Sequence, residues 1–513
     1  MNSHFRAAAS LATAFAATAA LSLGFAAPAA AHGDSAHIEK MRAEHAAGTS
    51  VPGLMSPNVE HVRNVPGQAA ISGCFTKTAP LFVTSGLESV RVYNVKKPLE
   101  PTQVGVLPNA LFENEAMNCG ERATGQGTKR FALIGVDAVQ ASPDDPQHVN
   151  TLGNELIIVD VTNPADPHIQ ARVAGTTSTH TVACIRETNC TYAYSAGDNG
   201  TDSFSIFDLR NLNKPTEVDS NPNRAGVQPF ASPTAAHKWN FDNAGYGTHT
   251  GFDGSSIFDV SSPRHPRLVT TTGVAGRGEK ADGTPNGYND FIHHNSFRPN
   301  AKAFRANTAP SFANGNILLV TEEDYEQTDC TQAGSFQTWH VKRLNGAPNA
   351  IVPLDKVEIS DLGNFPAPQF AFCSAHWFDY HPSGVVAIGY YGGGTQLVDV
   401  RNPRKLKSFG HAYWGASEVW DSYWVPAYNK KGVATGGKTN IVYSIDLIRG
   451  LDVYSVDLPG GARAANTVSL ASANPFAAFS WPEDALPISL VAFAFGGFLV
   501  LRRRVAKETV NRR

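Results

Sequence analysis

Six positions in this chain place a histidine or a glutamate shortly before an apolar, strand-like segment. The first is Glu115 in Asn-Glu-Ala-Met-Asn-Cys, and the last is Glu418 in Ser-Glu-Val-Trp-Asp-Ser. Four histidines take the positions between them: His180, His237, His293 and His376. Imidazole and carboxylate groups bind transition metals and transfer protons near neutral pH. If the six side chains converge, they predict a site for Zn, Cu, Fe or Mn.

A structural interpretation competes with this one. A single histidine before a strand is most often a hydrogen-bonded turn residue. Recurrence at one register is a stronger signal, because a solvated turn has no reason to repeat histidine or glutamate. Segments that share an ancestor could nevertheless retain a histidine that bonds the neighbouring segment's backbone. The sequence also leaves open whether His293 or the adjacent His294 points inward.

Other polar residues are expected on the same face, at the ends of the strands that run back. They are Asp198, Asn199, His249, the run Glu322-Glu323-Asp324, and the pair Tyr390-Tyr391. The acidic run lacks the regular ligand spacing of a calcium loop. We interpret it as a solvated patch or as the rim of the site.

A repeated element must position these residues. Its clearest copy is Leu-Ile-Ile-Val-Asp-Val-Thr-Asn-Pro-Ala-Asp-Pro, residues 156–167, an apolar strand followed by Asp and a proline-containing turn. Further copies begin at Val90, Phe204, Ser256 and Gln396, with degenerate copies at Phe336 and Leu451. The Asp or Asn side chain is expected to bond local backbone amides, while proline ends the strand ladder.

Seven copies, most of them about fifty to sixty residues apart, leave room for four strands each. They predict an all-β, seven-bladed β-propeller over residues 58–457, in which the recurring strand is the third of its blade. The last copy has no fourth strand after it, so residues 58–65 are expected to close the ring. The first strand of each blade would then begin at one mouth of a central channel. A two-sheet β-sandwich array is the alternative.

The phrase Leu-Ile-Ile-Val-Asp-Val-Thr-Asn-Pro, followed by Asp-Pro, resembles the repeat of the LVIVD-repeat propeller proteins of bacterial cell surfaces. The resemblance covers most of the chain from Val90 to Val400. It implies a propeller and an extracytoplasmic location. It implies no settled biochemical activity.

The two ends indicate export and anchoring. Residues 1–31 have the apolar run and the small residues of a cleavable signal peptide, although an uncleaved anchor is the alternative. A polar segment, residues 32–57, follows. Residues 458–484 predict a linker, residues 485–501 a single transmembrane helix, and residues 502–513 a basic cytoplasmic tail. The body would therefore lie outside the cell membrane.

Composition narrows the function further. The formal charge is −3, which argues against a nucleic-acid partner. Six cysteines in an exported chain predict disulfides, with Cys184–Cys190 as the best pair and Cys74–Cys119 and Cys330–Cys373 as weaker pairs.

Two functions remain compatible with the sequence. The favoured one is a surface binding or scaffold module that recognises an extracellular ligand or protein through its channel face. The alternative is a metal-dependent enzyme, an oxidoreductase or a hydrolase, with the histidine and glutamate ring at the channel mouth. The chain shows no nucleophile elbow and no zincin helix, which argues against the common serine hydrolases and zincins.

Overall fold

A computed structural model describes residues 55–459 with internal gaps. The gaps are residues 67–69, 87–88, 109–114, 116, 137–153, 198–201, 235, 274–286, 289–290, 325–333, 363–372 and 415–416. The predicted signal peptide, membrane helix and basic tail all lie outside the described residues.

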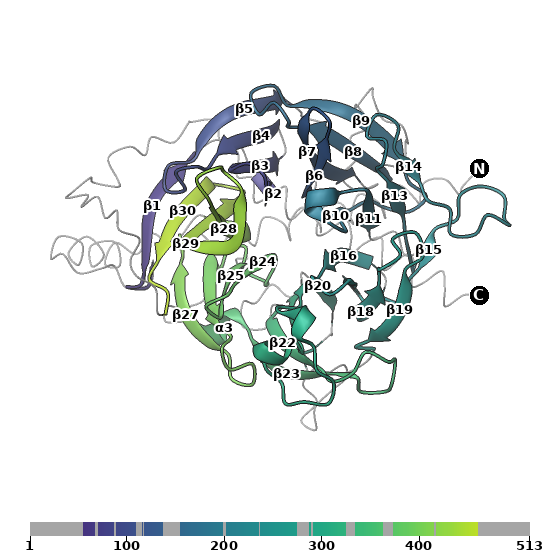
Figure 1. The fold of residues 1–513 in the computed structure, drawn as a ribbon. Helices are drawn as coiled ribbons and strands as arrows, with labels where there is room; N and C mark the ends of the chain where they lie inside the picture. The colour runs from purple at the N-terminus through teal and green to yellow at the C-terminus, as the bar shows by residue number, and fades with distance from the viewer. Residues whose placement is uncertain are drawn as a thin grey trace, which may run out of the picture. The chain divides into compact units, whose positions relative to one another are not determined.

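Seven four-stranded antiparallel sheets follow one another in a ring, as Figure 1 shows. Blades 1 to 3 consist of β2 (Ala70–Phe75), β3 (Leu81–Gly86), β4 (Ser89–Asn94) and β5 (Thr102–Pro108); β6 (Asn118–Thr124), β7 (Gly127–Val136), β8 (Glu155–Asp160) and β9 (His168–Ala174); and β10 (Thr181–Cys184), β11 (Tyr192–Ala196), β13 (Ile206–Asp208) and β14 (Thr216–Glu217). The predicted all-β, seven-bladed propeller is confirmed.

The remaining blades have the same order. Blades 4 to 7 consist of β16 (Ala236–Phe241), β17 (Tyr246–Gly251), β18 (Gly254–Asp259) and β19 (Arg267–Thr271); β20 (Ile292–Phe297), β21 (Ile317–Glu323), β22 (Phe336–Val341) and β23 (Ile351–Val357); β24 (Phe378–His381), β25 (Val385–Gly389), β26 (Thr395–Asp399) and β27 (Lys407–Ala412); and β28 (Val419–Tyr428), β29 (Ala434–Asp446), β30 (Gly450–Val456) and β1 (Val59–Val65). Outside the blades lie the two-stranded sheet of β12 (Ser203–Phe204) and β15 (Phe230–Ala231), the 3-10 turns η1 (Glu187–Asn189), η2 (Ala301–Ala303) and η3 (Phe312–Asn314), and the short helix α3 (Ile359–Leu362).

The recurring sequence phrase is the third strand of each blade and the turn after it. The side chain of Asp160 accepts a hydrogen bond from the amide of Thr162 at 2.7 Å, and that of Asp399 accepts one from Arg401 at 3.0 Å. The same contact follows β4, β13 and β18. A carboxylate or amide oxygen that captures the amide two residues later turns the chain outward into the fourth strand.

Apolar side chains fill the space between neighbouring blades. Residues of β8 are buried along the whole strand, as expected for a sheet covered on both faces. One core cluster joins Val83 and Val92 of blade 1 to Ile134 and Ile157 of blade 2. Each blade therefore holds its neighbours in place, and the first strands are positioned around the ring axis.

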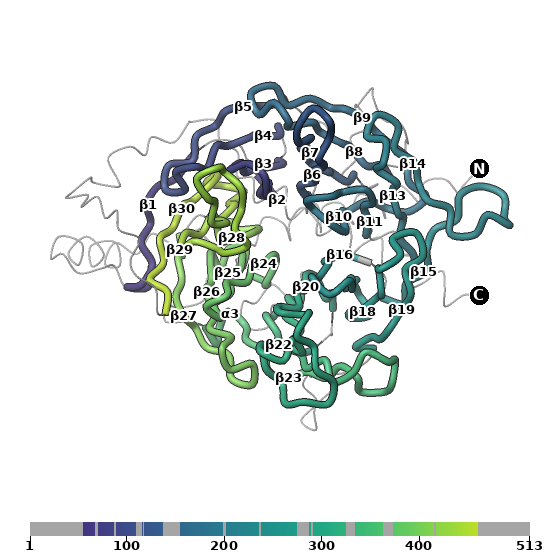
Figure 2. The backbone as a smooth tube through the Cα atoms, in the orientation of Figure 1, coloured from purple at the N-terminus to yellow at the C-terminus, as the bar shows by residue number. Residues whose placement is uncertain are grey.

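The ring closes through strands from opposite ends of the described chain. β1 pairs antiparallel with β30, from Val59 opposite Val456 to Val65 opposite Leu451. Figure 2 shows the purple β1 beside the yellow β30. The prediction that residues 58–65 complete the last blade is confirmed.

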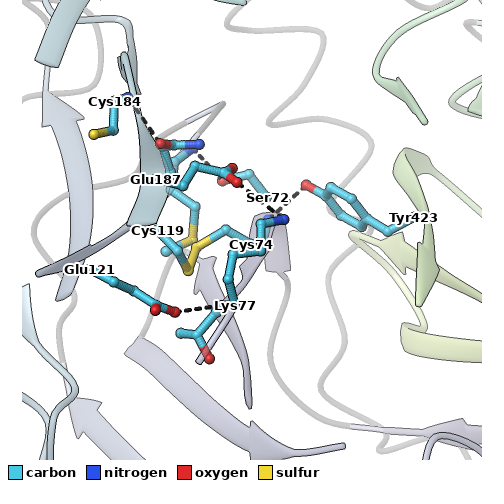
Figure 3. Close-up of a disulfide and its surroundings, with 12 residues drawn as sticks. Ser72, Cys74, Lys77, Cys119, Glu121, Cys184, Glu187 and Tyr423 are labelled. Carbon is cyan, nitrogen blue, oxygen red and sulfur yellow. Dashed lines mark hydrogen bonds and ion pairs between the residues drawn. A yellow bond between two sulfur atoms is a disulfide. The ribbon is translucent and has the colours of Figure 1, made fainter. Parts of the chain in front are cut away.

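Disulfides add covalent links. Cys74 of β2 pairs with Cys119 of β6, which joins blades 1 and 2 (Figure 3). Cys184 pairs with Cys190. Both predicted pairings are confirmed. Cys373 is also disulfide-bonded, while its predicted partner Cys330 lies outside the described residues.

No helix in the described part of the chain is long and apolar enough to cross a membrane. The predicted span, residues 485–501, is outside that part.

Candidate metal centre

The carboxylate of Glu115 lies at the centre of a cluster of imidazoles. Its Oε1 atom is 2.8 Å from His294 Nε2 and 2.9 Å from His376 Nε2. His237 Nε2 is 3.7 Å from the same oxygen, and His180 Nε2 contacts Oε2. One side chain from blade 2 therefore meets histidines from four other blades.

The four histidines form an arc across consecutive blades. His180 precedes β10, His237 lies in β16, His294 lies in β20 and His376 precedes β24. Adjacent ring centroids are 4.8 Å, 4.2 Å and 4.1 Å apart along the arc. Figure 1 shows these first strands around the axis of the ring. Propeller symmetry thus gathers residues that are far apart in the sequence.

β-Bulges direct two of these histidines inward. The pairing of β16 with β17 leaves His237 as an extra residue, and the pairing of β20 with β21 does the same for His294. An extra residue disrupts the alternation of side chains and re-aims the bulged residue. His293 remains paired with Glu322, and its Nδ1 lies 2.8 Å from the Ser255 hydroxyl oxygen. In blade 5 the structure thus brings His294, and not His293, to Glu115.

Glu418 also stands apart from the cluster. Its Oε1 accepts a hydrogen bond from the Trp420 indole at 3.0 Å. Trp420 itself is the extra residue where β28 pairs with β29. Blade 7 therefore places an aromatic side chain at the bulge, and the Trp420 ring lies 5.1 Å from that of His376. Of the six residues predicted from sequence, the structure brings together Glu115, His180, His237 and His376.

Two residues at the ends of returning strands complete the cluster. Glu323, the last residue of β21, places Oε2 3.6 Å from His294 Nε2. Its Oε1 accepts a hydrogen bond from the Tyr391 hydroxyl at 2.6 Å. The sequence placed both residues on this face, but nothing in it distinguished Glu323 from Glu322. Glu322 instead accepts a hydrogen bond from the amide of Phe291 at 3.0 Å.

His249, which was expected on the same face, is not part of the cluster. Its Nδ1 lies 2.7 Å from the Ser232 hydroxyl oxygen, and its ring stacks on Trp239 with centroids 4.3 Å apart. It is a packed histidine of blade 4. The expected residues Asp198 and Asn199 lie outside the described residues.

Burial and neighbouring charges shift the pKa values of the glutamates and histidines in the cluster in different directions. Burial would raise the pKa of Glu115, but His180 and His237 hold that pKa well below its usual value. Burial lowers the pKa of His237 to about 3 and that of His294 well below its usual value. Burial raises the pKa of Glu323 to about 7. The centre therefore presents an ionised Glu115 beside the neutral imidazoles of His237 and His294, the protonation states that metal binding requires.

His376 has its tautomer set by the backbone. Its Nδ1 lies 2.7 Å from the carbonyl oxygen of Trp420. A carbonyl can only accept a hydrogen bond, so Nδ1 carries the proton and the lone pair of a neutral ring lies on Nε2. That atom faces Glu115 at 2.9 Å. Two lone pairs at this distance require a cation between them, either a proton or a metal ion.

The same contacts of His376 also favour a proton as the cation between it and Glu115. Burial lowers the pKa of His376, but hydrogen bonding and charge from Glu115 raise it overall. Without a metal, these contacts therefore favour the protonated form of His376. An Nδ1–H donated to a carbonyl with Nε2 free for a ligand is also the usual arrangement of a metal-binding histidine.

The spacing of the cluster fits a transition metal. Ligands about 2.0–2.2 Å from one ion lie roughly 3.0–3.6 Å from each other when adjacent. The contacts of Glu115 Oε1 with the three histidine Nε2 atoms, 2.8 to 3.7 Å, span this range. The possible ligand atoms form two groups, and within each group all atoms lie within 4.8 Å of one another. One group consists of Glu115, His294, Glu323 and His376. The other consists of Glu115, His180 and His237. These residues fit Zn, Cu, Fe or Mn.

A buried cation lies next to the cluster. Lys238 Nζ lies over the Trp377 ring, 4.7 Å from its centroid. Burial lowers the pKa of Lys238 to about 8, and burial raises the pKa of the nearby Asp421 to about 7. The sequence singled out neither residue. Lys238 follows an inward histidine, and the position after each such histidine shows no common residue type.

Comparison with known proteins does not define the class of this protein. No family model matches the chain, and the curated proteins contain no match. Among solved structures, the chain is similar to the β-propeller domain of Cps50 (Swd1) from Myceliophteria thermophila. The identity is 10%, the match covers 78% of this chain and 100% of that chain, and the TM-score is 0.47. The assignment as a seven-bladed propeller rests on the sheets described above, and the LVIVD resemblance stays a prediction.

Proposed function

We propose that this protein is an extracytoplasmic β-propeller that binds a transition metal ion at the inner ends of its first strands. The observation that carries the proposal is the contact between His376 Nε2 and Glu115 Oε1, in which the backbone carbonyl of Trp420 fixes the tautomer. Three further imidazoles and Glu323 surround the same carboxylate. A purely structural histidine in each blade would not require five blades to meet at one carboxylate.

The ion would be approachable from one side. The side chain of His180 is 15% exposed, whereas those of His294 and His376 are fully buried. This asymmetry supports a role in which an extracellular ligand reaches the metal beside His180. In this role the propeller would be the binding scaffold, and the metal would supply its point of ligand contact.

The second candidate is a metal-dependent enzyme, either an oxidoreductase or a hydrolase. The observation in its favour is the same exposed edge, because catalytic metal sites keep a coordination position open for water or substrate. A bound ion would supply Lewis acidity or, for Cu, Fe or Mn, electron transfer. Knowing which metal is bound would help to distinguish an oxidoreductase from a hydrolase.

Elemental analysis tests the metal proposal. The full-length chain, exported and purified without chelator or metal-affinity tag, is expected to carry a stoichiometric transition metal. His376→Ala should carry less metal than the wild type, while His168→Ala, at an exposed histidine of β9, should retain the wild-type content. A folded, metal-free wild-type protein that takes up no Zn²⁺ or Mn²⁺ would overturn the proposal.

We also propose that the propeller lies outside the cell and is held by a single C-terminal helix. The disulfides support an oxidising compartment. The apolar residues 485–501 and the basic residues after them support an anchor with a cytoplasmic tail. Release of the propeller by protease treatment of intact cells, and its loss from the membrane fraction on deletion of residues 485–513, are the expected results.

A further inference from the structure

The ligand atoms of the candidate metal centre divide into two groups that meet at one residue. Glu115 belongs to both, with His294, Glu323 and His376 in one group and His180 and His237 in the other. We propose that the centre holds two metal ions bridged by the carboxylate of Glu115. This inference rests on the proposed metal-binding function and adds a second ion to it.

The two oxygens of Glu115 point to different histidines. Oε1 contacts His294 and His376 and lies 3.7 Å from His237 Nε2, and Oε2 contacts His180. Ligands of a single ion with bonds of at most about 2.2 Å lie within roughly 4.4 Å of one another. His180 and His376, at opposite ends of the arc, do not belong to one group. The carboxylate can therefore offer one oxygen to each of two ions, as in centres whose ions are about 3.5–4 Å apart.

The two positions differ in their ligands. Glu115, His294, His376 and Glu323 provide four protein ligands to the first position, and all four are buried. Four ligands complete a tetrahedral sphere, as in structural sites. The Tyr391 hydroxyl bonds the remaining oxygen of Glu323 and so orients that carboxylate.

The second position has Glu115, His180 and His237, three protein ligands, and includes the most exposed histidine of the cluster. Three ligands leave a tetrahedral ion one open position, as in catalytic sites. The ligand class that completes it is an oxygen donor, such as water, hydroxide or an anionic oxygen of a substrate. The closed ion would hold Glu115 in place, and the open ion would bind the ligand.

The number of metal ions bound per chain distinguishes the bridged pair from the proposed metal-binding function on which it rests. The full-length chain, stripped with chelator and titrated with Zn²⁺, is expected to bind two equivalents. One equivalent would overturn the bridged pair and leave the metal-binding function standing. Uptake of none by the folded protein would overturn both.

Paired variants assign the two positions. His180→Ala/His237→Ala is expected to bind one equivalent, and so is His294→Ala/Glu323→Gln. A different outcome is that the wild type binds one equivalent and both double variants bind none. That outcome would show a single ion held by all these side chains. Glu418→Gln is the matched control, because this nearby carboxylate belongs to neither group, and it should retain both equivalents. Circular dichroism must show that each variant retains the wild-type fold.

The bridge has a spectroscopic signature. Loaded with two equivalents of Mn²⁺, the wild-type chain should give the EPR spectrum of an exchange-coupled pair. Glu115→Gln removes the bridging charge and should abolish the coupled signal. Uncoupled Mn²⁺ signals in the wild-type protein at full loading would contradict the bridge.

Discussion

At the scale of single residues, Glu115 determines what the centre can bind. A buried carboxylate is costly unless charge or hydrogen bonds compensate it. Here the imidazoles of four blades surround it, and one of them, His376, has its proton placed by a backbone carbonyl. The free energy of folding therefore depends on a cation at this point, which is a proton in the metal-free protein and, in our proposal, a metal ion in the loaded one.

Tyr391 provides a residue-scale prediction. Its hydroxyl donates to Glu323 at 2.6 Å, so Tyr391→Phe leaves one carboxylate oxygen without that donor. Removal of such an outer partner typically weakens metal binding by about 10–100-fold. We expect this loss for one of the two equivalents, measured by competition with a chromophoric chelator.

The adjacent tyrosine is the control. The Tyr390 hydroxyl donates to the carbonyl of Val357 at 3.2 Å and does not contact the cluster. Tyr390→Phe should leave metal affinity unchanged. Equal affinities of the two variants would argue that Tyr391 does not orient a ligand.

At the scale of elements, the β-bulge decides which side chain enters the centre. His293 and His294 are neighbours in β20, where the bulge interrupts the regular alternation of side chains. The bulge makes His294 the extra residue, while His293 contacts Ser255 of β18 in the neighbouring blade 4. The same device places His237 in blade 4 and Trp420 in blade 7.

A pair of single variants tests the role of this bulge. His294→Gln should reduce affinity for the first metal position by more than the roughly 100-fold upper range of an outer partner. His293→Gln should bind metal as the wild type does, although it loses packing against Trp339. Isothermal titration with Zn²⁺ compares them, and metal loss in the His293 variant alone would show that the register assigned to β20 is wrong.

At the scale of the whole molecule, the ring depends on the joint between β1 and β30. Asp452 of β30 accepts hydrogen bonds from His61 of β1 at 2.8 Å and from Arg449 at 2.9 Å. Burial would raise the pKa of Asp452, but these bonds hold it below its usual value. A lowered folded-state pKa contributes stability above the unfolded pKa of about 3.9, and this contribution is lost as the pH falls through the folded value.

Asp452→Asn should therefore destabilise the propeller at pH 7 by roughly 1.5–3 kcal/mol, the range for hydrogen bonds to charged groups. The difference from wild type should shrink as the pH falls below about 4. Urea unfolding at several pH values measures it. Glu100→Gln, which removes an exposed pair with Lys97, should change stability by less than about 1 kcal/mol at any pH.

The disulfide between blades 1 and 2 gives a second whole-molecule prediction. Cys74 and Cys119 are 45 residues apart, and closing a loop of this length in the unfolded chain corresponds to about 4 kcal/mol in the chain-entropy model. Cys74→Ala/Cys119→Ala should therefore lower the free energy of unfolding by about 4 kcal/mol, as measured by urea unfolding. Cys184 and Cys190 are only 6 residues apart, so replacing that pair should cost less.

Sequence alone determined the propeller, its seven third strands and the residues that close it, because these features depend on local patterns. An apolar strand, an aspartate that binds the amide two residues later and a proline-containing turn are all encoded within about a dozen residues. The same local periodicity placed Glu115, His180, His237 and His376 at equivalent points of successive blades. The short spacing of Cys184 and Cys190 also predicted that pair, whereas Cys74–Cys119 was a weaker prediction.

Tertiary structure alone decided which members of that ring meet. Bulges and strand register decide that His294 and not His293 contacts Glu115. They also decide that Glu418 lies outside the cluster and that Glu323 belongs to it. An extra residue in a strand leaves no mark in the amino-acid pattern, because it is defined by pairing with a partner strand. The sharing of Glu115 between two groups of ligands likewise arises only when five blades surround one axis.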